Sequence, residues 1–329
     1  MTRPHVPEAV LTAAHDRARA RAEGDWAEAD RLRGVIEAAG WRIVDRGTDF
    51  SLSLAQAPDV RDEAGRIRYG SGRGVPSRLE EPPSGLATIV LVATDHPEAL
   101  DRTLSGLRDR SPTGTSIVVV ADAPSPEQSN GLESLEAEAR DGTSAAPVDV
   151  VWTSRRLGHA VAVDIGIRRA AAPVLILLRA GVRVAGDLVT PLARALDDPT
   201  VAIVGGRGAT SSDLRHFEDA PGGAVAVIVG EPVAFRRADY VERGPLDERF
   251  GSDRQLLIWW SLVLRDMGPG GSPRRAVQLA DLPFEEQGAA PGATADPGDR
   301  DRKTKRDGYR ILDRFGGRPD LAVPSAEPG

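Results

Sequence analysis

The amino-acid sequence predicts an α/β fold with a mostly parallel central sheet flanked by helices and a small helical hairpin at the N-terminal end. From residue 88 onward, short apolar runs alternate with amphipathic segments, which is the pattern of strand–helix units in parallel sheets. Residues 174–178 are all apolar but too few for a core helix, so we expect a central strand buried on both faces. Ligands of such sheets bind beyond the carboxyl ends of the strands, and here Arg179 follows the run.

The N-terminal hairpin is predicted from two amphipathic segments, 7–23 and 25–39. Apolar residues recur at helical spacing in both, and Gly24 and Gly40 end them. Asp25 begins the second segment with a capping-box pattern. Two short strands are expected to follow at 41–44 and 50–54.

The rest of the chain is predicted as a linker, one α/β domain and a C-terminal extension. Strands are expected at 88–93, 116–121, 148–152, 174–178, 201–205, 225–229 and 276–279. Helices are expected at 97–109, 132–140, 158–170, 188–196, 253–267 and 302–315. The predicted organisation is a hairpin unit (1–56), a Pro- and Gly-rich linker (57–86), an α/β domain (87–287), and a loose loop, a helix and a mobile tail (288–329).

Composition excludes several classes of function. A net charge of -7 argues against a general nucleic-acid surface, and the absence of cysteine excludes disulfides, thiolate zinc sites and a cysteine nucleophile. No apolar run approaches the roughly 20 residues that span a bilayer, and the N-terminus lacks the apolar region of a signal peptide. We therefore expect a cytoplasmic protein without a transmembrane segment. His96, His159 and His216 show no metal-ligand spacing and are expected to be incidental.

Two motifs carry a resemblance to a known family. Residues 158–170 read G-x-A-x-A-x-D-x-G-I-x-x-A before the apolar strand, and residues 230–250 read G-x-x-x-x-x-R-R-x-x-x-x-x-x-G-x-x-D-E-x-F. Together they resemble the family 2 glycosyltransferases, which are nucleotide-diphospho-sugar transferases with the GT-A fold. The resemblance implies a GT-A domain that binds a nucleotide-sugar, with an acceptor that the sequence does not identify.

The resemblance also locates a departure at the end of the central strand. In the family this strand ends in an Asp-x-Asp motif that holds a divalent metal on the sugar-nucleotide diphosphate. Here the aligned residues are Arg179, Ala180 and Gly181, so the family's metal is expected to be lost and no cofactor is expected. Two interpretations of Arg179 remain: its guanidinium pairs directly with the diphosphate, or it points to solvent in a decayed motif.

Three aspartates match or approach positions that lie near the nucleotide-sugar in the family. Asp95 lies in the turn after the first strand. Asp122 lies one place out of register with the family's acidic residue, so it either contacts the nucleotide or caps its own turn. Asp164 matches an Asn or Asp position in a helix that approaches the sugar-nucleotide, and its alternative is a solvated helix residue.

The resemblance places the family's acidic catalytic base at Leu256 and Leu257, which cannot accept a proton. Asp253 lies about one turn earlier on the same face, so it either reaches the cleft or forms the helix N-cap with Ser252. Asp247 fits the D-E-x-F motif as another candidate base, or is structural. Trp259 and Trp260 cannot both face one side of a helix, so one is expected in the core and the other on the acceptor side, against a sugar or a protein.

A second resemblance covers only the N-terminal unit. The segment ARAEGDWAEADRLRGVIEAAGWRIVDRGTDFSLS resembles the C-terminal end of cysteinyl-tRNA synthetases, without their catalytic domain. It is either an RNA-contacting module or a hairpin for packing or protein contact. The segment is not basic overall, which favours the second interpretation and makes tRNA the less favoured partner.

Three functions are therefore predicted, in descending order. The first is a pseudoenzyme that binds a nucleotide-sugar, because each lost acidic group removes several kcal/mol of stabilisation. The second is an active, metal-independent inverting glycosyltransferase that uses Arg179 for the diphosphate and Asp253 or Asp247 as base. The third is an RNA- or protein-binding adaptor acting through the hairpin.

Overall fold

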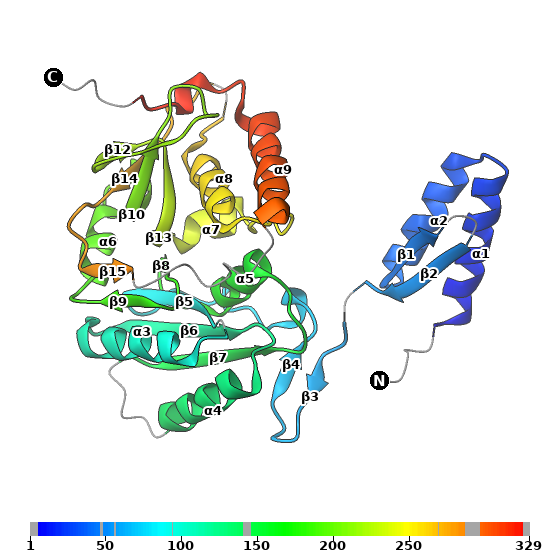
Figure 1. Ribbon diagram of the computed structural model, residues 1–329, viewed down its shortest axis with the longest axis horizontal. Helices are drawn as coiled ribbons and strands as arrows, with labels where there is room; N and C mark the ends of the chain where they lie inside the picture. The colour runs from blue at the N-terminus through cyan, green and yellow to red at the C-terminus, as the bar shows by residue number, and fades with distance from the viewer. Residues whose placement is uncertain are drawn as a thin grey trace. The chain divides into compact units, whose positions relative to one another are not determined.

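The computed structural model describes residues 6–46, 49–55, 57–93, 95–140, 146–268, 270–286 and 297–324, which form two compact units, Met1–Ser71 and Gly72–Gly329 (Figure 1). Several predicted features lie outside the described residues: Thr94 of the first turn, most of the loose loop (287–296) and the end of the tail (325–329). Across the described helices, none is long and apolar enough to cross a membrane.

The first unit packs two helices against a β-hairpin. Its elements are α1 (Glu8–Ala22), α2 (Trp26–Ala38), β1 (Trp41–Arg46) and β2 (Asp49–Leu54). The strands pair antiparallel, and Ala14, Ile36 and Trp41 are buried between helices and hairpin. The carboxylate of Asp25 accepts a hydrogen bond from the Glu28 amide at 3.0 Å, which confirms the predicted cap of α2.

The segment predicted as a linker contains ordered structure. Strands β3 (Val60–Arg61) and β4 (Ile67–Tyr69) form a small antiparallel hairpin, and η1 (Gly72–Gly74) is a single turn. Polar contacts hold the hairpin: the Asp62 carboxylate accepts hydrogen bonds from the Ala64 and Arg66 amides. Because these contacts leave no apolar periodicity, the sequence pattern did not reveal the hairpin.

The second unit is built on a mixed sheet with a parallel centre. Its strand order is β12-β14-β10-β13-β8-β5-β6-β7. The bounds are β5 (Ala87–Ala93), β6 (Thr115–Ala121), β7 (Val148–Thr153), β8 (Val174–Leu177), β10 (Val201–Thr210), β12 (Gly223–Val225), β13 (Val227–Arg236) and β14 (Arg275–Gln278). Strands β8, β5, β6 and β7 are parallel, whereas β13 runs antiparallel between β8 and β10. Short β11 (Glu218–Asp219) pairs with β10, and β9 (Val182–Val184) pairs with β15 (Phe284–Glu286).

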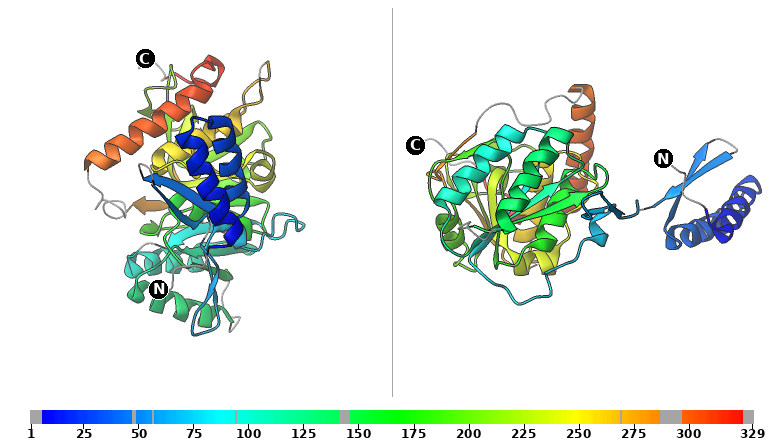
Figure 2. Two further views of the ribbon diagram at one scale, coloured as in Figure 1. Left: turned by 90° about the vertical axis from the view of Figure 1, so that its right-hand side faces the viewer. Right: turned by 90° about the horizontal axis from the view of Figure 1, so that it is seen from below.

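Helices cover both faces of this sheet (Figures 1 and 2). One face carries α3 (Pro97–Arg110), α4 (Pro126–Arg140) and α6 (Val189–Ala195). The other carries α5 (His159–Arg169), α8 (Asp253–Arg265) and α9 (Pro297–Phe315), with α7 (Arg237–Arg243) following β13. Successive residues of β5 alternate between the two cores, with Ile89 on one side and Val90 on the other, as expected for a strand buried on both faces.

Helix α5 lies unusually close to the sheet because of Gly166. A Cβ atom at Gly166 would lie 2.3 Å from Cγ1 of Val90, so a larger residue would push the helix away from β5. This close packing fixes the first turn of α5, at Gly158 and His159, beside the carboxyl ends of the central strands.

The chain after α9 differs from the predicted mobile tail. Residues 319–321 form the turn η2 (Pro319–Leu321), Leu321 is fully buried, and Val323 bridges to Ser211. The Leu321 carbonyl accepts a hydrogen bond from Nη1 of buried Arg265 at 2.7 Å, which ties the segment to α8. Up to residue 324, this part of the tail is therefore ordered.

Candidate functional site

A cavity of about 420 Å³ opens at the carboxyl ends of β5 and β8. Its walls include Ala93 from β5, Leu178 after β8, and Gly158 at the start of α5. The cavity therefore lies where ligands of parallel α/β sheets bind, beyond the carboxyl ends of the strands.

Asp95 borders this cavity as a charged wall residue. Its carboxylate accepts hydrogen bonds from the Ser125 amide at 2.8 Å and from Nη2 of Arg156 at 2.7 Å. These two donors lower the pKa of Asp95, the Ser125 amide having the larger effect. Asp95 and Arg156 thus neutralise each other at the rim of the cavity.

Asp122 borders the cavity, and its carboxylate binds the segment that leads into α5. The carboxylate accepts hydrogen bonds from the Leu157 amide at 2.7 Å, the Gly158 amide at 3.0 Å and the hydroxyl of Thr153 at 3.1 Å. Asp122 is only 6% exposed. The role of Asp122 in the structure is therefore to fix the chain entering α5, 31 to 36 residues later, rather than to cap its own turn as the structural alternative predicts.

Arg179 is a cation of the cavity wall whose donors remain available. It follows β8, is half-buried and lines the cavity rather than open solvent. Among the described residues, none hydrogen-bonds or ion-pairs with its guanidinium, whereas that of Arg156 is paired. A guanidinium with free N–H groups can bind a phosphate oxygen pair in a bidentate manner.

The residues at the end of β8 do not fit a divalent metal. Arg179, Ala180 and Gly181 offer no side-chain oxygen there, and the described part of the chain contains no cluster of three or more His, Cys, Asp or Glu side chains that could hold an ion.

His159 and Asp253 face each other across the same cavity. Nε2 of His159 lies 4.0 Å from Oδ1 of Asp253, and their side chains are 32% and 51% exposed. The N-cap predicted at Ser252-Asp253 falls on Ser252, whose hydroxyl accepts a hydrogen bond from the Gln255 amide at 3.5 Å.

Comparison with known families agrees with this architecture. Residues 88–247 match the sequence model of the family described as "Glycosyl transferase family 2". The second unit contains a glycosyl transferase family 2 domain. This confirms the resemblance predicted from the two motifs.

Solved structures of GT-A glycosyltransferases share the fold of this glycosyltransferase domain. The mannosyltransferase PcManGT from Pyrobaculum calidifontis, in complex with GDP-Man and Mn²⁺, is 18% identical with a TM-score of 0.54, over 75% of this chain and 70% of that chain. GalNAc-T7 with UDP, GalNAc and Mn²⁺ is 16% identical with a TM-score of 0.54, over 79% of this chain and 52% of that chain. At such identities the likeness establishes the fold alone.

A different relative matches another, shorter part of the chain. Cysteine--tRNA ligase 1 of Burkholderia lata is 58% identical over 59 residues, which are 17% of this chain and 13% of that protein. The chain therefore spans only about an eighth of this relative, whose resemblance was predicted for the N-terminal unit.

Two predicted site residues of the glycosyltransferase domain lie away from the cavity. Asp164 is buried and accepts hydrogen bonds from the Tyr240 hydroxyl at 2.8 Å and the Leu246 amide at 3.1 Å, and burial raises its pKa to about 7. Asp247 binds the Arg249 side chain and amide in its own turn, and the Arg249 guanidinium lowers its pKa. In the structure both carboxylates are thus engaged by protein groups, and neither residue lines the cavity.

The acceptor-side prediction for Trp259 and Trp260 is also not supported, because both are buried outside the cavity. Trp260 packs edge-on against Phe235, and Trp259 lies under the guanidinium of Arg314 at 5.6 Å from its ring centre. The two adjacent residues are both covered because α9 shields the face of α8 that would otherwise meet solvent.

Four further polar residues of the cavity were not singled out from the sequence, Arg156 among them. His96 and His159 were considered incidental, and Glu231, in β13, is only 5% exposed. A signal existed for the histidines, since His96 follows Asp95 and His159 follows the first glycine of the helix motif. Glu231 reaches the cavity from within a strand, which no rule about strand ends would find.

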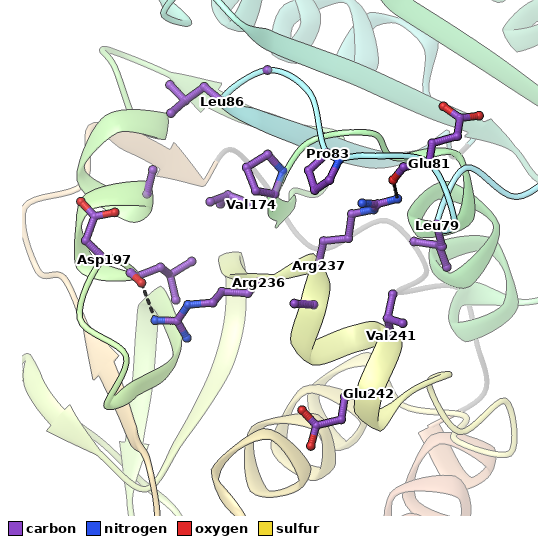
Figure 3. A pocket seen from close by; sticks show the side chains of 15 residues that line it. Leu79, Glu81, Pro83, Leu86, Val174, Asp197, Arg236, Arg237, Val241 and Glu242 are labelled. Carbon is purple, nitrogen blue, oxygen red and sulfur yellow. Dashed lines mark hydrogen bonds between the residues drawn. The ribbon is translucent and has the colours of Figure 1, made fainter.

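A larger cavity of about 680 Å³ lies at the amino ends of β5 and β8 (Figure 3). Its walls are mostly apolar and include Leu86, Val174 and Val241. Arg236 and Arg237 extend in different directions from the end of β13, and both donate to main-chain carbonyls, including that of Glu81 at 2.9 Å (Figure 3). Because these donors are engaged, the larger cavity is the poorer site for a diphosphate.

Proposed function

We propose that the glycosyltransferase domain binds a nucleoside diphosphate sugar, without a divalent metal, in the cavity at the carboxyl ends of β5 and β8. The observation that supports this most strongly is Arg179, which follows β8 at the aligned position of the family's metal motif and whose guanidinium bonds to none of the residues that the structure describes. The relatives of the same fold were solved with GDP-Man or UDP and Mn²⁺. In this chain the planar fork of Arg179 supplies positive charge instead.

The base of the family has no equivalent at its usual place. Leu256 and Leu257, which occupy the aligned positions, are 3% and 5% exposed in the core. Neither the metal motif nor the acidic base is therefore retained. We propose that the family's own catalytic apparatus is degenerate and that donor binding is the activity the cavity preserves.

Thermal unfolding of the purified protein tests donor binding. We expect at least one of UDP-, GDP- and dTDP-sugars to raise the melting temperature equally in EDTA and in Mn²⁺. Arg179→Ala should abolish the shift, whereas Arg215→Ala, an exposed arginine outside both cavities, should preserve it. A shift that requires Mn²⁺, or no shift with any donor, would contradict the proposal.

The N-terminal unit supports a second candidate function, contact with RNA. The observation that favours it is the 58% identity to a cysteine–tRNA ligase. Trp26 is 61% exposed with the Arg21 guanidinium 5.5 Å from its ring, and exposed aromatic rings can stack on unpaired bases. We expect tRNA binding that weakens with salt and that Trp26→Ala reduces; binding absent at low salt would leave protein contact as the role of this unit.

A further inference from the structure

We infer that His159, supported by Asp253, accepts the proton of an incoming hydroxyl, so that the domain cleaves the sugar from its nucleotide. This inference rests on the proposed donor binding. It starts from geometry: the two side chains line the cavity that Arg179 lines, and Nε2 of His159 lies 4.0 Å from Oδ1 of Asp253. Each is the first residue of a helix, His159 of α5 and Asp253 of α8.

The helix that carries His159 is fixed from two directions. Asp122 holds the Leu157 and Gly158 amides directly before it. Because Gly166 has no side chain, α5 packs closely against Val90 of β5. Because Asp122 engages the amides ahead of α5, the imidazole of His159 is not needed to cap them.

The helix that carries Asp253 is also fixed by other residues. The fully buried carboxylate of Asp307, in α9, accepts hydrogen bonds from the Gly251 amide at 2.8 Å and the Ser252 amide at 3.0 Å. Arg310 donates to the same carboxylate at 3.0 Å and balances its charge. With Ser252 as the cap, the carboxylate of Asp253 has no structural task in the helix and faces His159.

The reaction assigned to this pair balances without a metal. The hydroxyl oxygen of water or an acceptor forms a bond to C1 of the sugar, and the bond from C1 to the diphosphate breaks with its electron pair on the diphosphate. Arg179 pairs with that leaving group. The hydroxyl proton passes to Nδ1 of His159, and the imidazolium formed faces the carboxylate of Asp253. Imidazole suits this step because, as a class, it exchanges protons near neutral pH.

Donor hydrolysis in EDTA tests the inference, with GDP-mannose, UDP-N-acetylgalactosamine and dTDP-glucose as probes. His159→Ala should lower the hydrolysis rate about 100-fold while the donor-induced thermal shift is retained. Added imidazole should restore part of the rate, which a purely structural defect would not allow. Asp253 is a positioning residue in this scheme. The Asp253→Asn variant should have a kcat about 10-fold lower than wild type and an unchanged donor affinity. The Asp253→Glu variant should regain most of the wild-type kcat.

The chain offers a matched control in a second histidine–aspartate pair. Nδ1 of His216 lies 2.7 Å from Oδ2 of Asp213 on an exposed turn outside the cavity. The His216→Ala variant should therefore hydrolyse the donor at the wild-type rate. Wild-type protein that binds a donor without cleaving it, or His159→Ala that cleaves at the wild-type rate, would overturn the inference and leave donor binding intact. Absence of any donor binding would instead remove the proposed function and the inference with it.

Discussion

The two cavities of the glycosyltransferase domain lie at opposite ends of β5 and β8, and each is lined by arginine side chains. They differ in what the guanidinium groups bind. Arg179 has no partner among the described residues, whereas Arg237 donates to the carbonyls of Arg78 and Glu81. The presence of arginine at a cavity therefore does not identify a phosphate site, because the hydrogen-bonding state of its N–H groups decides what it can bind.

The chain direction explains the difference. At the carboxyl ends of the strands, the first turn of α5 lines the cavity, and none of the described carbonyls accepts a hydrogen bond from the Arg179 guanidinium. At the amino ends of the strands lies the segment before β5, whose Ser84 amide donates a hydrogen bond to the Ala171 carbonyl at 2.9 Å. The buried Arg237 donates to two carbonyls of this segment, those of Arg78 and Glu81, and so ties the segment to the start of α7.

A hydrogen bond joins the helices that border the two cavities, and it gives the largest expected effect. Asp164 of α5 accepts from Tyr240 of α7, and the pKa of Asp164 is raised to about 7 by burial. An unfolded aspartate titrates near pH 3.9, so between about pH 4 and 7 the folded state keeps a proton that the unfolded state releases. The contribution of this group to the free energy of unfolding therefore falls as the pH rises over that range.

Asp164→Asn should remove this pH dependence. Relative to wild type, the variant should gain as much as about 4 kcal/mol of unfolding free energy between pH 4 and pH 8. Urea unfolding of both proteins across that range measures the difference. A difference that stays constant with pH would contradict this account, because it would mean that the pKa of Asp164 is the same in the folded and unfolded states.

Arg237→Ala tests the structural side of the comparison. The substitution removes the Arg237 donor from the Glu81 carbonyl and one of the two donors of the Arg78 carbonyl, and it should lower the free energy of unfolding by about 2–4 kcal/mol. Donor affinity, measured at a temperature where the variant is folded, should stay within about twofold of wild type. Loss of affinity with little loss of stability would reverse the roles assigned to the two arginines.

Gly166→Ala tests whether the packing of α5 sets the donor cavity. The added Cβ would meet Val90 at 2.3 Å, and we expect a loss of about 1–3 kcal/mol together with a smaller donor-induced thermal shift. Gly131→Ala in α4 is the matched control: nothing lies within 4 Å of its Cβ position, so the helix should gain up to about 1 kcal/mol. Equal effects of the two substitutions would mean that close packing at Gly166 is not needed.

Arg179→Ala should have the smallest effect on stability. Since its guanidinium bonds to none of the described residues, the free energy of unfolding should change by less than about 0.5 kcal/mol. Donor affinity should nevertheless fall about 10- to 100-fold, because a charge-assisted hydrogen bond contributes about 1.5–3 kcal/mol. Calorimetric titration and urea unfolding of the same preparation separate these two results.

Much of the fold could be predicted because its signals are local. The apolar run 174–178 and the strand predicted at 88–93 correspond to β8 and β5, and the helix predicted at 97–109 corresponds to α3. Asp95, Asp122, Arg179 and Asp253 reach one cavity because strand ends and helix starts meet there, which follows from topology alone.

The remaining site residues depended on contacts between distant segments. Asp164 is buried only because Tyr240, 76 positions later, packs onto it, and Trp259 is covered only because α9 returns across α8. Glu231 reaches the cavity through the antiparallel insertion of β13 between β8 and β10. Sequence periodicity describes one element at a time, so it cannot report which face a later element will cover.

The most direct test of the central claim is the affinity for the best-bound donor as Mn²⁺ is varied. Isothermal titration calorimetry in EDTA and at increasing Mn²⁺ concentrations would be carried out on wild-type protein and on Arg179→Ala. The account predicts a wild-type dissociation constant that is the same within about twofold in all conditions, and binding that is weak in the variant whatever the metal. A wild-type affinity that collapses in EDTA and is restored by Mn²⁺ would contradict it, because the diphosphate would then be held by a cation and not by Arg179.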